Sequence, residues 1–200
     1  TLQRLGYESP AYFIFTVEGR LFDRLPHALF IQTVPNPFST VVGAAQWSGD
    51  SRRIDDLLNL LDNTSVPLFV HVHLLESHGP RYDPAIQQFS AGQEQPNKWM
   101  TDFYDDTILS FDAYLGRLIE ALKTTGQFDQ TLLIVYSDHG MGFQTAERVP
   151  LLIHFPAEQY VGTIQTNVQN LDIAPTILDY LDVPVPEWME GESIFHFSTQ

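Results

Sequence analysis

Short apolar runs alternate with helical patterns along this chain. The runs are rich in β-branched and aromatic residues, so each predicts a strand: Ala11–Val17, Ala28–Val34, Pro67–His73, Thr131–Tyr136 and Val149–Phe155. The third and fourth are nearly continuous in apolar residues, which is typical of strands covered on both faces. Strands that alternate with helices predict an α/β fold with a mainly parallel sheet and helices on both faces.

Three segments have the three-to-four-residue apolar spacing of helices: Ile54–Leu61, Thr101–Lys123 and Asp172–Leu181. In the longest one we expect a single buried stripe of Tyr104, Ile108, Phe111, Leu115, Leu118 and Leu122, with the helix ending near Gly126. Asp172 is expected to cap the last helix, with Pro175 at its third position. The segment Gly79–Asn97 is rich in Pro, Gln and Gly and predicts a long surface loop, a length that is often functional.

Composition narrows the classes of protein and ligand. A length of 200 residues predicts one domain spanning 1–200. The absence of cysteine excludes disulfides and cysteine-based zinc sites. The formal charge of −15 argues against a nucleic-acid partner, and it means that an anion site needs a local cation. The apolar runs are too short to form a membrane-spanning segment.

A carboxylate and an imidazole follow the predicted strand Thr131–Tyr136, in the sequence Ser137-Asp138-His139-Gly140. Ligands of α/β sheets bind beyond the carboxyl ends of strands, and Gly140 allows the chain to turn so that both side chains converge on one cation. Mixed oxygen and nitrogen ligation suits a divalent cation such as zinc or manganese. The same residues also fit a polar turn in which Asp138 caps backbone amides, so both interpretations stay open here.

Histidines cluster around the end of the predicted strand Pro67–His73. His71 and His73 share one face by the period of two, and we expect them to be buried or hydrogen-bonded rather than ligands. His78 lies beyond the strand in a Ser-His-Gly-Pro turn, where an imidazole can donate to an ester oxygen or protonate a leaving group. An ordinary loop histidine is the alternative.

These motifs resemble those of sulfatases in the alkaline phosphatase superfamily, and also those of phosphoethanolamine transferases. Asp138-His139-Gly140 is similar to their metal motif, and Ser77-His78-Gly79-Pro80 to their substrate-histidine segment. Further similar segments follow in the family's order: Tyr104–Leu118, Glu147–Leu151, Asp172–Leu178 and Pro186–Ser193. The resemblance covers residues 67–193.

The resemblance implies an alkaline phosphatase-like three-layer α/β/α sandwich that hydrolyses or transfers a sulfate or phosphate ester with the help of a metal. Asp138 and His139 would bind a divalent cation (zinc, calcium or manganese), and His78 would contact the transferred group or the leaving oxygen. The implied substrate is a small, glycan or lipid ester. The implied location is extracytoplasmic, either periplasmic or associated with a membrane through a tether in the full protein.

The chain departs from the family in three respects. It has no cysteine and no segment that matches the family's amino-terminal nucleophile motif. It supplies only two metal ligands, where a catalytic zinc site usually takes three from protein. Between Gly140 and Glu147 it has six residues without Lys or His, where many relatives carry a basic residue in a longer loop.

Two interpretations follow from these departures. We expect a chain whose amino-terminal part is missing and which is inactive until that part is supplied. The alternative is a catalytically inactive module that binds a partner or an anionic glycan. If the site is shared, the imidazoles of His78 and His139 should lie within about 10 Å of each other, since a metal–ligand bond spans about 2 Å and an ester adds a few more.

Overall fold

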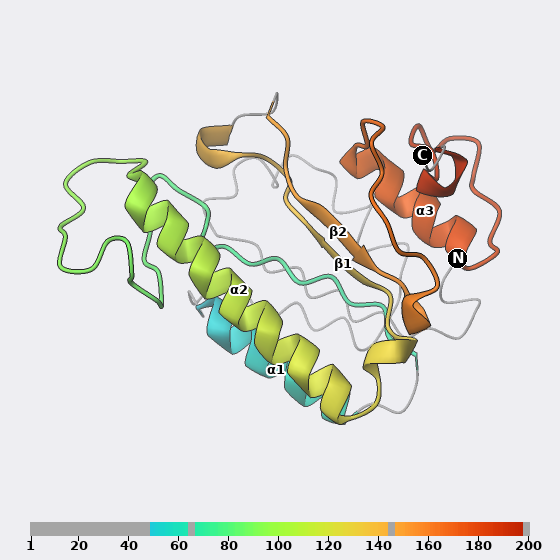
Figure 1. The fold of residues 1–200 in the computed structure, drawn as a ribbon, viewed down its shortest axis with the longest axis horizontal. Coiled ribbons are helices and arrows are strands. Elements are labelled where there is room, and N and C mark those ends of the chain that lie inside the picture. The colour runs from blue at the N-terminus through green and yellow to red at the C-terminus, as the bar shows by residue number, and fades with distance from the viewer. Residues whose placement is uncertain (1–48, 64–66, 144–146, 198–200) are drawn as a thin grey trace. The chain divides into compact units, whose positions relative to one another are not determined.

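The structure is a computed structural model that describes residues 49–63, 67–143 and 147–197 (Figure 1). The predicted strands Ala11–Val17 and Ala28–Val34 lie outside the described residues. The chain divides into two compact units, Thr1–Ala121 and Leu122–Gln200. The expectation of a single domain over residues 1–200 stays a prediction.

Two helices dominate the described part of the first unit and run side by side (Figure 1). Helix α1 (Asp50–Asp62) begins at Asp50 rather than at the predicted Ile54, and it buries Ile54 and Leu57. Helix α2 (Thr101–Thr124) confirms the predicted Thr101–Lys123. Arg117 of α2 joins the two helices, since its guanidinium forms an ion pair with Asp55 and donates to the Ser51 hydroxyl of α1.

The buried face of α2 differs from the predicted apolar stripe. Ile108 is 45% exposed, and several of the buried positions of α2 are polar. The buried residues are Phe103, Asp106, Thr107, Ser110, Tyr114, Leu118 and Leu122. Leu118 and Leu122 confirm the prediction at one end of the helix. Toward its start the buried face is displaced by about one residue position, which on a helix is a rotation of about 100°.

The reason for the displacement is the loop that covers the start of α2. Asp106 accepts hydrogen bonds from the backbone amides of Gln88, Phe89 and Ser90, each at 2.9 Å, and from the Ser90 hydroxyl at 2.6 Å. Ser110 accepts from the amide of Ile86 at 3.0 Å. A loop carries unpaired amides that an apolar stripe cannot satisfy, so polar residues occupy the covered face.

The second unit contains a two-stranded sheet. Strands β1 (Leu133–Tyr136) and β2 (Leu151–His154) confirm the two predicted strands, although each is shorter than its apolar run. They pair antiparallel, with Leu133 opposite His154 and Tyr136 opposite Leu151. The prediction of a mainly parallel sheet is therefore wrong for this pair of strands. A parallel pair needs a crossover, usually helical, and the described part of segment 137–150 holds only a 3₁₀ helix, Met141–Phe143.

Two further predictions about the sheet are corrected. Coverage on both faces is incomplete in the described part of the chain, because all four residues of β1 are half-buried and Leu152 of β2 is 62% exposed. The run Pro67–His73 forms no strand, because only Leu68 makes a β-bridge. Residues 67–74 nevertheless alternate between exposed and half-buried, as an extended chain does. The apolar pattern therefore predicted an extended backbone correctly, but it did not show that this segment lacks the hydrogen-bonded partner strand that a sheet requires.

The carboxyl-terminal segment of the second unit folds around helix α3 (Ile173–Tyr180), with Pro175 at the expected third position. Asp172 precedes the helix but does not cap it through its side chain. Its carboxylate instead accepts from the amides of Gln169, at 2.8 Å, and Glu192, at 2.9 Å. The predicted cap is therefore corrected to a link between two segments.

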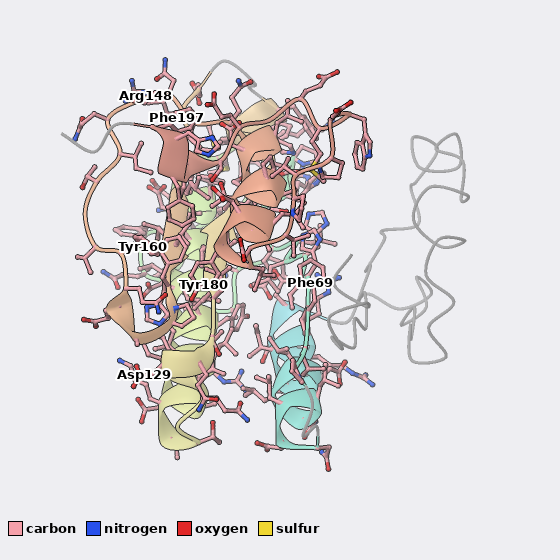
Figure 2. The ribbon with its side chains drawn as sticks, turned by 90° about the vertical axis from the view of Figure 1, so that its right-hand side faces the viewer. Phe69, Asp129, Arg148, Tyr160, Tyr180 and Phe197 are labelled. Atoms are coloured by element: carbon pink, nitrogen blue, oxygen red, sulfur yellow. The ribbon has the colours of Figure 1, made fainter. Side chains whose placement is uncertain are left out.

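Two close contacts complete this unit. A Cβ on Gly191 would lie 2.0 Å from the carbonyl oxygen of Leu171, so only glycine allows the backbone approach that brings Glu192 to Asp172. Phe155 is buried against the rings of Tyr160, Tyr180 and Phe195, with centroids 5.0, 5.3 and 5.5 Å away. The two tyrosines are labelled in Figure 2.

We expect the contact between Asp106 and the loop to depend on pH. Burial by itself raises the pKa of Asp106, but the hydrogen bonds from Ser90, Phe89 and Gln88 together hold it below its usual value. The unfolded chain has the ordinary pKa of about 3.9. The ionised carboxylate therefore stabilises the fold above that pH, and this stabilisation is lost as the pH falls through the folded-state pKa.

The variant Asp106→Asn tests this. At neutral pH it should unfold at a lower temperature than the wild type, and the gap between the two melting temperatures should narrow as the pH falls below about 4. Asp112→Asn, at an exposed position of the same helix, serves as the control and should leave the melting temperature nearly unchanged. A gap for Asp106→Asn that stays constant with pH would contradict the assignment.

Candidate functional site

Asp138 and His139 lie directly beyond the end of β1, in the second unit. Their side chains approach each other, with 3.8 Å between Oδ1 of Asp138 and Nε2 of His139. The turn is held by the Ser137 hydroxyl, which donates to the carbonyl oxygen of His139 at 2.7 Å, and by Asn170, which donates to the carbonyl oxygen of Ser137 at 2.9 Å. The structure thus brings the two predicted ligands together on one turn.

The donor set suits a divalent cation. Nδ1 of His139 lies 2.8 Å from the carbonyl oxygen of Gly140. A carbonyl can only accept, so in the neutral imidazole this contact places the proton on Nδ1 and leaves on Nε2 the lone pair that a metal needs. Nε2 is the nitrogen that faces Asp138, whose side chain is 62% exposed. Within the described ranges no group of three or more His, Asp or Glu residues is arranged to hold a metal.

An aromatic ring lies against this turn. The ring of Phe143 is 4.7 Å from the imidazole of His139, centroid to centroid, and its side chain is half exposed. Burial, and secondarily the negative charge of Asp138, raises the pKa of Tyr136 at the end of β1. The surroundings of the two predicted ligands therefore include the ring of Phe143 and the side chain of Tyr136.

His78 lies in the first unit, on a turn closed by the hydrogen bond from its own amide to the carbonyl oxygen of Leu75, at 2.9 Å. The side chain is exposed, with Nδ1 3.1 Å from the carbonyl oxygen of Gly79. In the neutral imidazole that contact places the proton on Nδ1. An exposed imidazole on a defined turn is suited to contact a ligand.

Aromatic rings hold the residues that follow His78. A Cβ on Gly79 would lie 2.2 Å from the ring of Trp99, so the indole occupies the space that any larger residue would need. The amide of Trp99 donates to the carbonyl oxygen of Pro80 at 2.9 Å. Tyr82 is buried edge-on against Trp99 and Tyr104, and burial, followed by the effect of Tyr104, raises its pKa to about 12.

A polar network precedes His78, and sequence reasoning assigned it no role. Asp50 is 3% exposed and binds the backbone of Leu75 and Glu76, while Glu76 binds the hydroxyl of Tyr114. The sequence separations are 25 to 38 residues. No local pattern encodes contacts at such range, although an Asp at a helix start followed by an acidic residue just beyond an extended apolar run is a weak signal.

His71 and His73 are both exposed, so the alternative that they are buried is wrong. Residues two positions apart share a face of an extended chain, so His71 and His73 lie on the same face as Phe69. Phe69 is 38% exposed and is labelled in Figure 2. Partial desolvation, and then the neighbouring His73, lowers the pKa of His71. His78 belongs to one unit and His139 to the other, so their separation of about 10 Å stays a prediction.

Comparison with known proteins identifies the family. The family described as Sulfatase matches residues 32–183. The chain belongs to the sulfatase family of the alkaline phosphatase superfamily.

Three curated relatives share parts of the chain. A Drosophila melanogaster protein named extracellular sulfatase SULF-1 homolog is 30% identical over 65% of this chain and 14% of its own length. The N-acetylglucosamine-6-O-sulfatase of Bacteroides thetaiotaomicron is 32% identical over 48% of this chain and 20% of its own. Arylsulfatase K of Danio rerio is 25% identical over 84% of this chain and 35% of its own length. This chain therefore spans well under two thirds of these relatives.

One solved structure shares the fold. The crystal structure of Ps i-CgsB in complex with k-i-k-neocarrahexaose is 24% identical, with a TM-score of 0.54. The match covers 72% of this chain and 36% of that one. At this identity the likeness is one of fold.

The contact between Gly79 and Trp99 gives a testable prediction. Gly79→Ala would force the indole or the His78 turn to move, and overpacking of this kind costs about 1–3 kcal/mol of unfolding free energy. Gly116→Ala is the matched control, because a Cβ there would meet nothing within 4 Å and alanine favours a helix by up to about 1 kcal/mol. Urea unfolding of both variants measures the difference. Equal stability of Gly79→Ala and the wild type would contradict the packing.

Proposed function

We propose that the protein containing this chain hydrolyses sulfate esters with the help of a divalent cation. The observation that carries the proposal is the convergence of the Asp138 and His139 side chains at the end of β1, 3.8 Å apart. Membership of the sulfatase family supports the reaction class. The architecture proposed for the whole protein is the three-layer α/β/α sandwich.

Asp138 and His139 are proposed to be two of the ligands of a zinc, calcium or manganese ion. A cation there supplies charge neutralisation at the ester oxygens. The chain needs such a local positive charge, because its formal charge of −15 repels an anionic substrate. The Ser137 hydroxyl holds the backbone of the turn, and the carbonyl oxygen of Gly140 orients the His139 imidazole before a ligand arrives.

His78 is proposed to contact the sulfuryl group or the leaving oxygen. With Nδ1 facing the carbonyl oxygen of Gly79 at 3.1 Å, Nε2 is the atom that can accept a hydrogen bond from a bound substrate. After protonation it can donate to an ester oxygen or protonate the leaving group. A sugar sulfate is the first substrate to test, because one relative is named N-acetylglucosamine-6-O-sulfatase. Phosphate esters are the competing class.

The proposed location is extracytoplasmic, since one relative is named an extracellular sulfatase. None of the helices in the described ranges has the length and apolar character needed to cross a membrane. A membrane tether elsewhere in the full protein stays part of the proposal.

The alternative function is a catalytically inactive module that binds a partner or an anionic glycan. Two observations favour it: the described residues offer no group of three metal ligands, and segment 141–146 has no Lys or His. The two functions differ in whether a nucleophile and further ligands are present in the longer protein.

Activity separates these functions. The 200-residue chain should show little or no turnover of aryl sulfates, because two ligands without a nucleophile do not make a working site. A longer polypeptide that adds the family's nucleophile segment should be active. There Asp138→Asn and His139→Ala should each lower kcat/KM by about a thousandfold or more, with loss of bound metal.

The control for these variants is Asp129→Asn, at an exposed position of the second unit, which should keep full activity and metal content. Metal content is measured by elemental mass spectrometry beside the kinetics. Activity of the short chain that is insensitive to Asp138→Asn would show that the site is elsewhere. An inactive longer polypeptide, even with metal supplied, would favour the binding module.

The role of His78 has a separate test in the active polypeptide. His78→Ala should lower kcat by about 10²–10⁴-fold while the bound metal is unchanged, because its proposed contact is with the ester. His73→Ala, also at an exposed position, is the control and should retain wild-type kinetics. Loss of metal in His78→Ala would make it a ligand instead, and unchanged kcat would remove it from the site.

A further inference from the structure

Two carboxylates hold the backbone from which the His78 turn is built. The carboxylate of Asp50 accepts from the amide of Leu75 at 2.9 and 2.8 Å and from the amide of Glu76 at 2.7 Å. In the other direction, Oε1 of Glu76 accepts from the amide of Asp50 at 3.2 Å. Each side chain therefore binds the backbone of the other's segment, so α1 and residues 75–76 cannot move independently.

Tyr114 extends this network to α2. Its hydroxyl donates to both carboxylate oxygens of Glu76, at 3.0 and 3.1 Å. The path to the proposed site residue is then short, because the carbonyl oxygen of Leu75 accepts from the amide of His78 at 2.9 Å. The turn is thus attached to both helices through residues two and three positions before the imidazole.

Burying these charged groups costs desolvation free energy, and apolar packing could stabilise the fold without that cost. Asp50 is 3% exposed and its ion-pair partner Arg53 is 6% exposed, and apolar residues often give equal or greater stability than a buried ion pair. Burial raises the pKa of Glu76, and burial together with the bond to Glu76 raises the pKa of Tyr114, which keeps the hydroxyl protonated as a donor. What directed hydrogen bonds add beyond apolar packing is a fixed geometry.

We propose that Asp50, Glu76 and Tyr114 are positioning residues that set the location of the His78 imidazole. The proposal rests on the proposed role of His78. It assigns the three residues no contact with the substrate, and they act only through the turn. Aromatic packing of Trp99 on Gly79 holds the other side of the same turn.

Kinetics of the active polypeptide test the proposal with Tyr114→Phe, which removes one oxygen and keeps the ring. We expect kcat for an aryl sulfate to fall about tenfold, as for a catalytic group that is slightly misplaced, with KM and metal content nearly unchanged. The double variant Tyr114→Phe/His78→Ala should be no slower than His78→Ala alone, because the first change acts through the second residue. A lower melting temperature with unchanged kcat, or effects that multiply in the double variant, would overturn the proposal.

Variants at Glu76 and on α1 give the matched controls. Glu76→Gln keeps an acceptor for Tyr114 and for the amide of Asp50, so it should retain most of the activity, whereas Glu76→Ala should lose at least as much as Tyr114→Phe. Asp55→Asn changes an exposed carboxylate on the same helix as Asp50 and should leave kcat unchanged. Equal kcat for Glu76→Gln and Glu76→Ala would contradict the role of the hydrogen bonds.

A second measurement on the 200-residue chain does not depend on activity, so it separates this proposal from the proposed function. NMR follows the Cε1–Hε1 signal of His78, assigned by its loss in His78→Ala, and the exchange of the amide protons of Leu75 and Glu76. In Tyr114→Phe the His78 signal should shift and the amide protons should exchange about tenfold faster or more. An unchanged His78 signal with unchanged exchange would overturn the positioning role, whether or not the longer protein is a sulfatase.

Discussion

Buried aspartates satisfy backbone amides that no helix or strand can pair, and the irregular segments of this chain depend on them. Asp50 binds the amides at residues 75–76, Asp106 those at 88–90 and Asp172 those of Gln169 and Glu192. The three aspartates are 3%, 0% and 5% exposed. A buried amide without a partner is costly, so each carboxylate decides where a loop lies against its helix.

This constraint explains why the proposed site can be built on turns. His78 and the pair Asp138–His139 lie outside regular elements, yet each turn is fixed by side chain–backbone bonds or by a packed ring. Loops provide access for a substrate, while such contacts provide the defined geometry that catalysis needs.

Because the chain has a strongly negative net charge, a site for an anionic ester needs a local positive charge. With 25 acidic and 10 basic residues, the protein field opposes the approach of a sulfate ester. The described surroundings of Asp138 and His139 include the ring of Phe143 and the side chain of Tyr136. In the proposed mechanism a cation bound by these two residues would supply local positive charge.

The sequence by itself determined the helices α2 and α3, the strands β1 and β2 and the family, because periodicity and short motifs are local properties. It also placed Asp138 and His139 on one turn, since adjacent residues at a strand end need no distant partner. Only the tertiary structure decided the antiparallel pairing of β1 with β2, the polar covered face of α2 and the link from Asp172 to Glu192. These features depend on which backbone groups, far apart in the sequence, need hydrogen-bond partners. The spacing of residues along the chain does not show which groups those are.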